Sequence, residues 1–195
     1  MGALPDRSTL SVEDYLQLDR KSDEARYEYL DGNLRLWAGG TLDHASIAAN
    51  IIGVLYSLVD DHSCRVFTSD ARVRLAEKRF VYPDVSVSCQ EHDRGQTDTI
   101  ESPLLIVEVL SESTEAYDRG RKFAYYRECL TIQEYVLVDT QRQAVEVFRR
   151  ETDHLWTYHA FGPGEEVELA SLGVRFPLAN VYRNIRFSEN DPPSA

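Results

Sequence analysis

The chain has 195 residues, of which 43% are hydrophobic and 28% are charged, and its formal net charge at pH 7 is −12. This length and composition are typical of one globular domain with a substantial core, and we expect a single domain over residues 1–187. The negative charge argues against broad electrostatic attachment to nucleic acid or to an anionic membrane, although it leaves room for a local basic patch.

The N-terminal part predicts a helix, a hairpin and a second helix. Ser11 precedes acidic residues in the manner of a helix cap, and Asp31-Gly32 is a pair that tolerates the positive φ of a tight hairpin turn. Apolar residues then recur at helical spacing. The expected elements are a helix over residues 11–24, antiparallel strands over 27–30 and 33–37, and a helix over 44–60.

Strands dominate the remainder of the chain. Alternating and continuous apolar runs predict most of them, and Ser113 and Thr114 can cap one further helix. We expect the C-terminal tail, residues 188–195, to be disordered. The other expected elements are strands over 65–75, 81–88 and 104–110, an exposed connection over 89–102, a helix from about 113 to 129, and strands near 134–138, 144–148, 155–159 and 167–169.

The cysteines and the apolar runs bear on the compartment. Cys64, Cys89 and Cys129 are odd in number and far apart, and they contain no Cys-x-x-Cys pair, so the spacing indicates neither a disulfide framework nor a zinc site. Residues 1–8 lack a signal pattern, and the apolar runs are too short to cross a bilayer. We expect a soluble, cytoplasmic protein whose cysteines are small buried hydrophobes in a reducing environment.

Two acidic residues on consecutive predicted strands are the most informative feature of the chain. Glu108 lies in a run of Leu, Ile and Val that predicts a strand buried on both faces, and Asp84 lies on the preceding strand. An ionised carboxylate in such a strand costs several kcal/mol unless a cation or several donors compensate it. The pattern therefore favours a divalent metal held by oxygen ligands, with positions open to water and substrate.

The order of these elements resembles the core of the PD-(D/E)xK nuclease superfamily, and the motifs are similar to those of the Uma2 family of restriction-endonuclease-like proteins. The resemblance extends from about Leu10 to Phe187. It implies an α+β (α/β) fold with a central mixed sheet, flanking helices and additional antiparallel strands. The residues that carry it are Glu28–Gly32, His44, Tyr82–Val85, Val107–Ser111, Ser113-Thr114, Asp118, Lys122, Tyr126, Glu134-Tyr135 and Val138-Asp139.

The resemblance implies a metal-dependent endonuclease that acts on nucleic acid, and on DNA in the first place. Asp84 and Glu108 would hold Mg²⁺ or Mn²⁺, with the carbonyl of Val109 as a further ligand. The superfamily's lysine falls at Leu110 here, and Lys122 from the following helix looks like its substitute. The other interpretation of Lys122 is a surface pair with the residue four positions before it, worth only about a few tenths of a kcal/mol.

Glu28 is the fourth catalytic candidate. It resembles the extra N-terminal carboxylate of many superfamily members, which could hold a second metal or fix a metal-bound water, or it is an acid at the edge of a strand in a hairpin. Two further residues are secondary candidates. His44 stands at a helix start, where it could reach the site or cap the helix. Asp70 could line the same cleft or pair with Arg72, and we do not interpret it as a metal ligand.

Two expectations concern partners and an alternative function. Trp156, Tyr158 and Phe161 on the C-terminal strands offer apolar surface, which together with the frequency of symmetric pairs favours a homodimer. Leu110 and the acidic composition also leave open a nuclease-like fold that has lost catalysis. Such a protein would act as a module that binds nucleic acid or protein.

Overall fold

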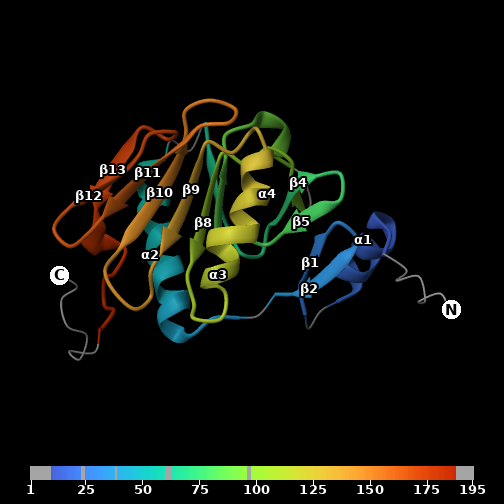
Figure 1. Cartoon of the computed structure of the whole chain (residues 1–195), viewed down its shortest axis with the longest axis horizontal. Helices are drawn as coiled ribbons and strands as arrows, with labels where there is room; N and C mark the ends of the chain where they lie inside the picture. The colour runs from blue at the N-terminus through green and yellow to red at the C-terminus, as the bar shows by residue number, and fades with distance from the viewer. Residues whose placement is uncertain (1–9, 23–24, 38, 60–62, 96–97, 188–195) are drawn as a thin grey trace, which may run out of the picture.

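The computed structural model describes residues 10–22, 25–37, 39–59, 63–95 and 98–187 (Figure 1), so the tail expected to be disordered lies outside the described residues. The helices are α1 (Val12–Lys21), α2 (Leu42–Leu58), α3 (Glu115–Tyr117) and α4 (Phe123–Glu128), with a π-helical turn η2 (Asp118–Lys122) and the 3₁₀ turns η1 (Glu91–Asp93) and η3 (Leu178–Asn180). The strands are β1 (Tyr27–Leu30), β2 (Asn33–Leu36), β3 (Arg65–Thr68), β4 (Arg72–Ala76), β5 (Arg79–Val81), β6 (Val85–Ser88), β7 (Thr99–Ile100), β8 (Leu105–Val109), β9 (Glu134–Val138), β10 (Val145–Arg150), β11 (Trp156–Phe161), β12 (Glu166–Leu169) and β13 (Val174–Pro177).

A six-stranded mixed sheet forms the centre of the molecule. Its order is β11-β10-β9-β8-β6-β3, with β8 and β9 parallel and the other neighbours antiparallel. Helix α4 lies in front of this sheet and α2 behind it (Figure 1). This arrangement confirms the expected α+β fold with a central mixed sheet. No helix in the described part of the chain combines the length and the apolar character that crossing a membrane requires.

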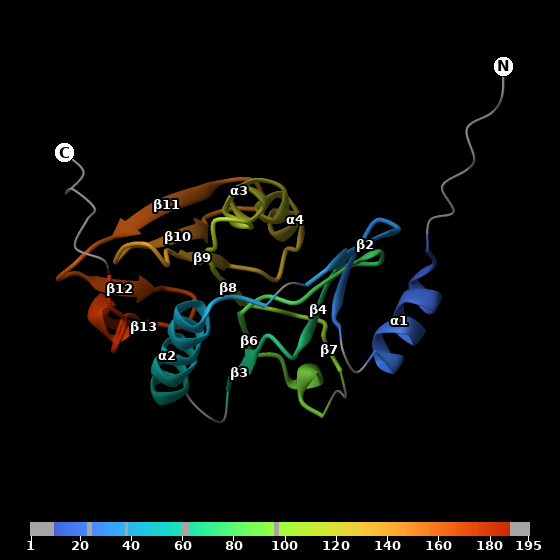
Figure 2. The same ribbon diagram turned by 90° about the horizontal axis from the view of Figure 1, so that it is seen from below.

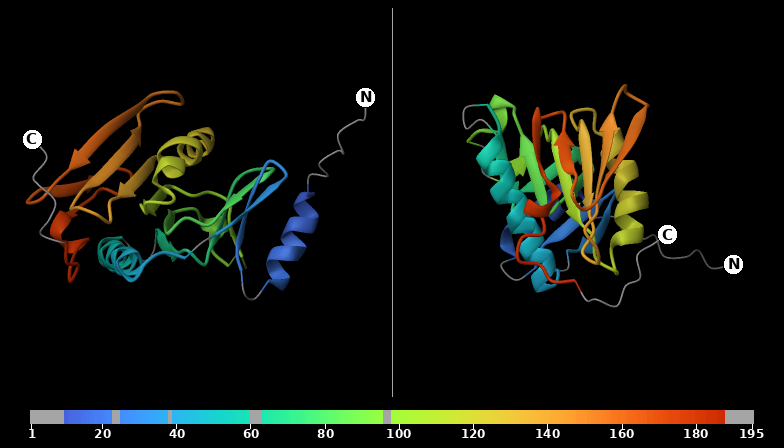
Figure 3. Two further views of the ribbon diagram at one scale, coloured as in Figure 1. Left: turned by 60° about the horizontal axis from the view of Figure 1, so that its bottom comes forward. Right: turned by 90° about the vertical axis from the view of Figure 1, so that its left-hand side faces the viewer.

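The second sheet contains the N-terminal hairpin and has the order β2-β1-β5-β4-β7. Asp31 and Gly32 adopt φ values of 52° and 91° at the hairpin turn, as the sequence predicts. Tyr15 of α1 stacks on Tyr29 of β1 with ring centroids 4.9 Å apart. Figure 3 shows α1 and the hairpin, in blue, at one end of the molecule, and the β12-β13 pair, in red, at the other. Helix α1 thus packs against β1 and β5 of the second sheet through Tyr15, Tyr29 and Phe80.

Strand β8 distributes its side chains to two different cores. Leu105, Val107 and Val109 pack in the cluster that includes residues of α2, whereas Ile106 and Leu110 pack with residues of α4. Successive side chains of a strand point to opposite faces. Glu108 therefore faces the α4 side of the sheet, on the same side as Leu110.

Two predicted strands are each divided in the structure. The segment 65–75 forms β3 and β4, and the segment 81–88 forms β5 and β6; in both cases the two strands belong to different sheets. Tyr82-Pro83-Asp84 separates β5 from β6, where proline has no N–H group to donate to a ladder. The predicted connection 89–102 contains η1 and β7, and β13 was not predicted. Apolar alternation does not reveal such breaks, because apolar residues recur on both sides of each break, as Phe67 and Val73 do in the first segment.

The interpretation of all three cysteines as free thiols is wrong. Cys64 and Cys89 form a disulfide, and Cys129 is free and buried. Cys64 directly precedes Arg65, the first residue of β3, and Cys89 directly follows Ser88, the last residue of β6; Arg65 and Ser88 are paired in the antiparallel ladder. They are 25 residues apart in sequence, so only the pairing of the two strands places them opposite each other. The disulfide joins the edge strand β3 to β6, the strand that follows Asp84.

The disulfide predicts a measurable dependence of stability on reductant. Protein denatured without reductant should expose one titratable thiol, from Cys129, and three after reduction. Because the bond closes a loop of 25 residues, reduction should lower the free energy of unfolding by about 3 kcal/mol. Urea unfolding with and without reductant measures this change, and a Cys64→Ser/Cys89→Ser variant should show no effect of reductant. Three thiols before reduction would contradict the disulfide.

Candidate active site

Most of the predicted site residues meet in one cleft of about 330 Å³ between the hairpin, the start of α2 and the segment from β8 to η2. Glu28, Asp84, Glu108 and Lys122 line it, and they are only 3, 7, 4 and 5% exposed. His44 and the main chain of Val109 also border the cleft. The floor of the cleft is therefore a set of charged groups almost removed from solvent.

Glu108 is held by two neighbouring side chains. Its Oε1 lies 2.7 Å from Lys122 Nζ and accepts a hydrogen bond from the hydroxyl of Tyr126 at 2.5 Å. Burial raises the pKa of Glu108 to about 8, and the charges of Asp84 and Asp118 act in the same direction while Lys122 opposes them. Glu108 therefore binds its proton more tightly than an exposed carboxyl does, and additional positive charge in the site would favour the ionised form.

Lys122 comes from the π-helical turn η2 and reaches two carboxylates. Its Nζ lies 3.0 Å from Glu28 Oε1 in addition to its contact with Glu108. Burial opposes the charged form of Lys122, but the charges of Glu108 and Glu28 raise its pKa well above the ordinary value. The structure thus contradicts the interpretation of Lys122 as a surface partner of Asp118.

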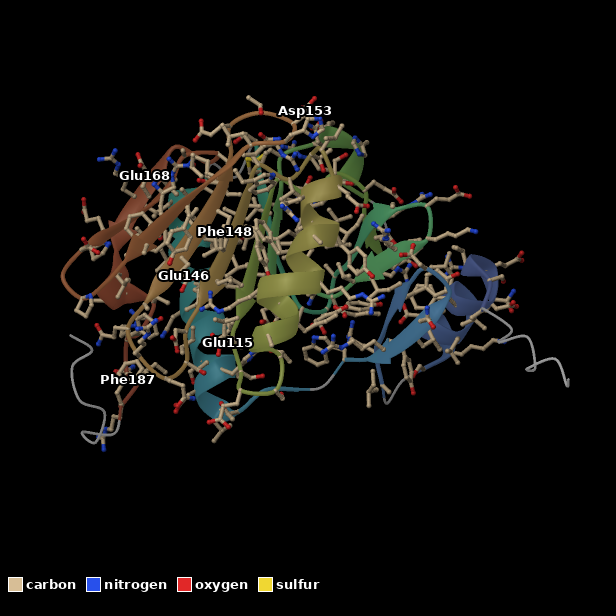
Figure 4. The ribbon with its side chains drawn as sticks, viewed as in Figure 1. Glu115, Glu146, Phe148, Asp153, Glu168 and Phe187 are labelled. Atoms are coloured by element: carbon tan, nitrogen blue, oxygen red, sulfur yellow. A yellow bond between two sulfur atoms is a disulfide. The ribbon has the colours of Figure 1, made fainter. Side chains whose placement is uncertain are left out.

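The turn that carries Lys122 is fastened to the central sheet. Arg119 donates to Glu115 at 2.7 Å and to Glu146 of β10 at 3.0 Å, and Figure 4 labels both acids. The hydroxyl of Tyr135 on β9 donates to the carbonyl of Asp118 at 3.2 Å. These contacts fix a π-helical turn, a rare conformation that is frequent at functional sites.

Asp84 is oriented by the neighbouring strand and by α2. Its Oδ2 accepts the Val109 N–H at 2.8 Å and lies 3.3 Å from His44 Nε2. Thr41 caps α2 through the N–H of His44, at 3.2 Å, which places the imidazole at the helix start. A Cβ at Gly40 would overlap the imidazole, so the absence of a side chain there makes room for His44.

The charge state of His44 depends on these partners. Burial lowers its pKa, but the hydrogen bond to Asp84, the charge of Asp84 and the Val109 carbonyl outweigh burial and raise the pKa above the ordinary value. The pairing with Asp84 therefore favours the cationic form of His44. It does not merely cap the helix.

Glu28 lies on β1 and reaches the cleft from the second sheet. Its Oε1 accepts the Tyr82 N–H at 3.4 Å as well as the contact with Lys122. Glu28 is buried, and β1 lies between β2 and β5 in the second sheet. The structure therefore contradicts the interpretation of Glu28 as an acid at the edge of the hairpin.

One candidate lies elsewhere, and three residues of the cleft were not assigned to the site from the sequence. Asp70 is exposed and forms an ion pair with Arg26 at 2.7 Å, neither in the cleft nor with Arg72. Asp118, which the sequence suggested as part of the family resemblance and as a partner of Lys122, adds a fourth carboxylate to the cleft. Arg35 stacks over the Tyr117 ring at 3.4 Å, and no spacing in the sequence linked these two residues.

The donor set of the cleft suits a hard cation. In the described part of the chain, no three or more His, Cys, Asp or Glu side chains are grouped closely enough to hold a metal on their own. Mg²⁺, however, is usually held by one or two carboxylates and keeps several waters. Four acidic side chains and one lysine line the cleft, and the contacts described above use only one oxygen each of Asp84 and Glu108. The residues therefore fit a divalent ion bound by few protein oxygens.

Comparisons with known proteins agree on one family and one fold. The sequence model of a family, described as "Uma2: Putative restriction endonuclease", matches residues 12–179. Two proteins of Synechocystis sp. (strain ATCC 27184 / PCC 6803 / Kazusa) are similar. "Uncharacterized protein slr1290" is 34% identical over 91% of this chain and 94% of its own length, and "Uncharacterized protein sll1609" is 31% identical over 85% and 95%.

A solved structure has the same fold. It is described as the crystal structure of "a putative nuclease belonging to DUF820" from Anabaena variabilis ATCC 29413, and it superposes with a TM-score of 0.73. The match covers 89% of this chain and 98% of that chain, at 19% sequence identity. This likeness concerns the arrangement of the elements.

The raised pKa of His44 predicts a pH-dependent contribution to stability. In metal-free protein the pairing with Asp84 should stabilise the fold fully below the ordinary pKa of histidine and should be lost as the pH rises through the folded pKa. His44→Ala should therefore lower the free energy of unfolding more at pH 5.5 than at pH 9. Urea unfolding in EDTA measures this difference; the exposed His154→Ala is the control, and an equal loss at both pH values would contradict the pairing.

Proposed function

This chain belongs to the Uma2 family, and we propose that it is a metal-dependent endonuclease that hydrolyses phosphodiester bonds in DNA. The observation that supports this most is the buried Glu108 beside Asp84 and Lys122 at the floor of one cleft. A purely structural site would not need this many costly charges, because buried charges are expensive unless each is compensated.

Asp84 and Glu108 would hold Mg²⁺ or Mn²⁺, with the Val109 carbonyl as a further oxygen donor. Such an ion, when bound, supplies Lewis-acid stabilisation of the charge that develops on a scissile phosphate. The hydrogen bond from the Val109 N–H fixes the Asp84 carboxylate, and Tyr126 fixes that of Glu108. His44 orients Asp84 from the opposite side.

Lys122 supplies the positive charge that the superfamily takes from the position of Leu110. Leu110 is buried in the apolar core on the Glu108 side of the sheet, so its own position could not present a cation without cost. A fixed ammonium group in a site shielded from water stabilises a developing negative charge far better than one in bulk solvent. Glu28 is an accessory acid that holds Lys122 in place.

The alternative is a nuclease-like fold that binds nucleic acid or protein without cleaving it. The observation in its favour is that two carboxylates already engage Lys122, which leaves its charge partly neutralised. Metal binding and partner binding without cleavage of any DNA or RNA substrate would support this alternative.

We also propose that two copies of the chain associate through the face that carries β11. This is an edge strand of the central sheet, and Tyr158 on it is 55% exposed. An edge strand presents unpaired main-chain groups, and isologous pairs are the commonest assemblies. Light scattering that gives a monomer at micromolar concentration would contradict it.

The endonuclease proposal predicts the effect of single substitutions at the floor of the cleft. Asp84→Asn, Glu108→Gln and Lys122→Met should each lower the rate of plasmid nicking in Mg²⁺ or Mn²⁺ by about 100-fold or more. The first two variants lose a carboxylate that would hold the metal, and the third loses the cation that stabilises the charge developing on the phosphate. Asp70→Asn, an exposed acid outside the cleft, is the matched control and should cleave as wild type does. Cleavage that persists equally in all variants would indicate a contaminant.

The pKa of Glu108 predicts the pH dependence of metal binding. Since that pKa is about 8, an ion that binds the carboxylate must displace its proton, and affinity should rise about tenfold per pH unit between pH 6 and 8 and then level off. Calorimetry in buffers of different ionisation enthalpy should detect proton release at pH 7. Glu108→Gln should bind weakly and release no proton, whereas an affinity independent of pH would contradict the assignment.

A further inference from the structure

The mouth of the cleft differs in chemistry from its floor. Arg35, Leu36 and Trp37 form one side of it, and Tyr117 lies against Arg35 with the guanidinium 3.4 Å from the ring centroid. Leu36 is 57% exposed. Within the described residues no carboxylate pairs with Arg35 and no aromatic ring stacks on Trp37. Planar cationic and aromatic groups thus line the entrance to the charged floor.

A second hollow of about 220 Å³ adjoins the first and shares four residues with it. The shared residues are Trp37, Gly40, His44 and Asp84. The rest of its wall consists of three alanines of α2, among them Ala49, and Ile52 of the same helix, together with Thr68 at the end of β3 and Ser69 after it. The His44–Asp84 pair therefore stands between two hollows, and Trp37 borders both.

The burial of the floor restricts which nucleic acid can reach it. Its charged side chains are at most 7% exposed, so a phosphate that contacts them has to enter the cleft. Enzymes that must reach a base inside a duplex act on an unpaired strand or take the nucleotide out of the stack. An unpaired strand, which is thinner and more flexible than a duplex, can likewise enter a recessed cleft more easily.

The charge distribution also disfavours a duplex. The chain carries a net charge of −12, and basic residues of the second sheet are paired with acids, as in Arg74 with Glu101 at 3.3 Å and Arg79 with Asp31 at 2.9 Å. A long duplex is bound chiefly through many phosphate contacts. An unpaired strand can instead be bound by stacking, which every base supports.

We propose that the two hollows form one binding groove for single-stranded DNA, with successive nucleotides on either side of the His44–Asp84 pair. One base stacks against Trp37 and another against Arg35 on Tyr117, so that the phosphate between them faces the floor. This inference rests on the proposed function, since it names the form of DNA that the same site accepts.

Binding without cleavage tests the inference separately from activity. The probe is a fluorescein-labelled DNA strand without self-complementarity, compared with the same strand annealed to its complement, and fluorescence anisotropy is measured with otherwise wild-type protein in EDTA. The single strand should bind at least tenfold more tightly than the duplex. Trp37→Ala and Arg35→Ala should each weaken binding of the single strand by about tenfold, the loss typical of one stacked base.

Matched variants test whether the single strand binds in the groove or elsewhere on the surface. Ala49→Leu, which fills the second hollow, should weaken binding several-fold, whereas Ser46→Leu on the same helix should not. Tyr56→Ala and Arg142→Ala replace exposed residues outside the groove and should bind as wild type does. Circular dichroism verifies the fold of each variant.

Equal or tighter binding of the duplex, unchanged binding by Trp37→Ala and Ala49→Leu, or no binding of the single strand would each overturn the inference. The two proposals also fail differently. If the single strand binds in a way that depends on Trp37 but no metal ion supports cleavage, the endonuclease proposal is wrong and the binding groove is supported. If the protein cleaves duplex DNA with a metal ion but does not bind the single strand, the endonuclease proposal is supported and the single-strand groove is wrong.

Discussion

The contact between Glu108 and Lys122 constrains the rest of the structure. Both side chains are almost fully buried, and removing one partner of such a pair costs about 3–5 kcal/mol because the other charge is left uncompensated. Strand β8 and the π-helical turn η2, which carry these two side chains, must therefore keep a fixed position relative to each other. Strand β8 is fixed by its neighbours β6 and β9, and the π-helical turn is fixed by Arg119 and by the hydroxyl of Tyr135.

The same contact joins the two sheets. Lys122 also reaches Glu28, which belongs to the hairpin of the second sheet, so one ammonium group connects β1 with β8. The hairpin is held in turn by Tyr15 of α1 and by the ion pair of Arg79 with Asp31 at 2.9 Å. The view turned by 90° in Figure 2 shows the hairpin and α2 on different sides of β6 and β8. The cleft thus exists because two separately stabilised layers meet, and its wall includes residues from both.

Charge separates this protein from nucleic-acid binders with a broad basic face. Its arginines largely serve internal ion pairs, such as those of Arg72 with Asp19 and Asp98 and of Arg149 with Glu134. The lysine and the arginine that line the cleft are Lys122 on its floor and Arg35 at its mouth. An arrangement of this kind concentrates recognition in a small recessed volume instead of spreading it along a surface.

The sequence determined the elements that local patterns specify and the pair of acids at their centre. The cap at Ser11, the Asp31-Gly32 turn, the helix that begins near His44 and the buried strand around Glu108 follow from spacing alone, because each depends on interactions within a few residues. Only the tertiary structure decided that Lys122 reaches Glu108 and not just Asp118, that Cys64 pairs with Cys89, and that Arg35 lies on Tyr117. The physical reason is that each of these contacts joins elements whose relative position is set by the packing of the whole core, and a single sequence without that packing does not fix which distant side chains share a buried space.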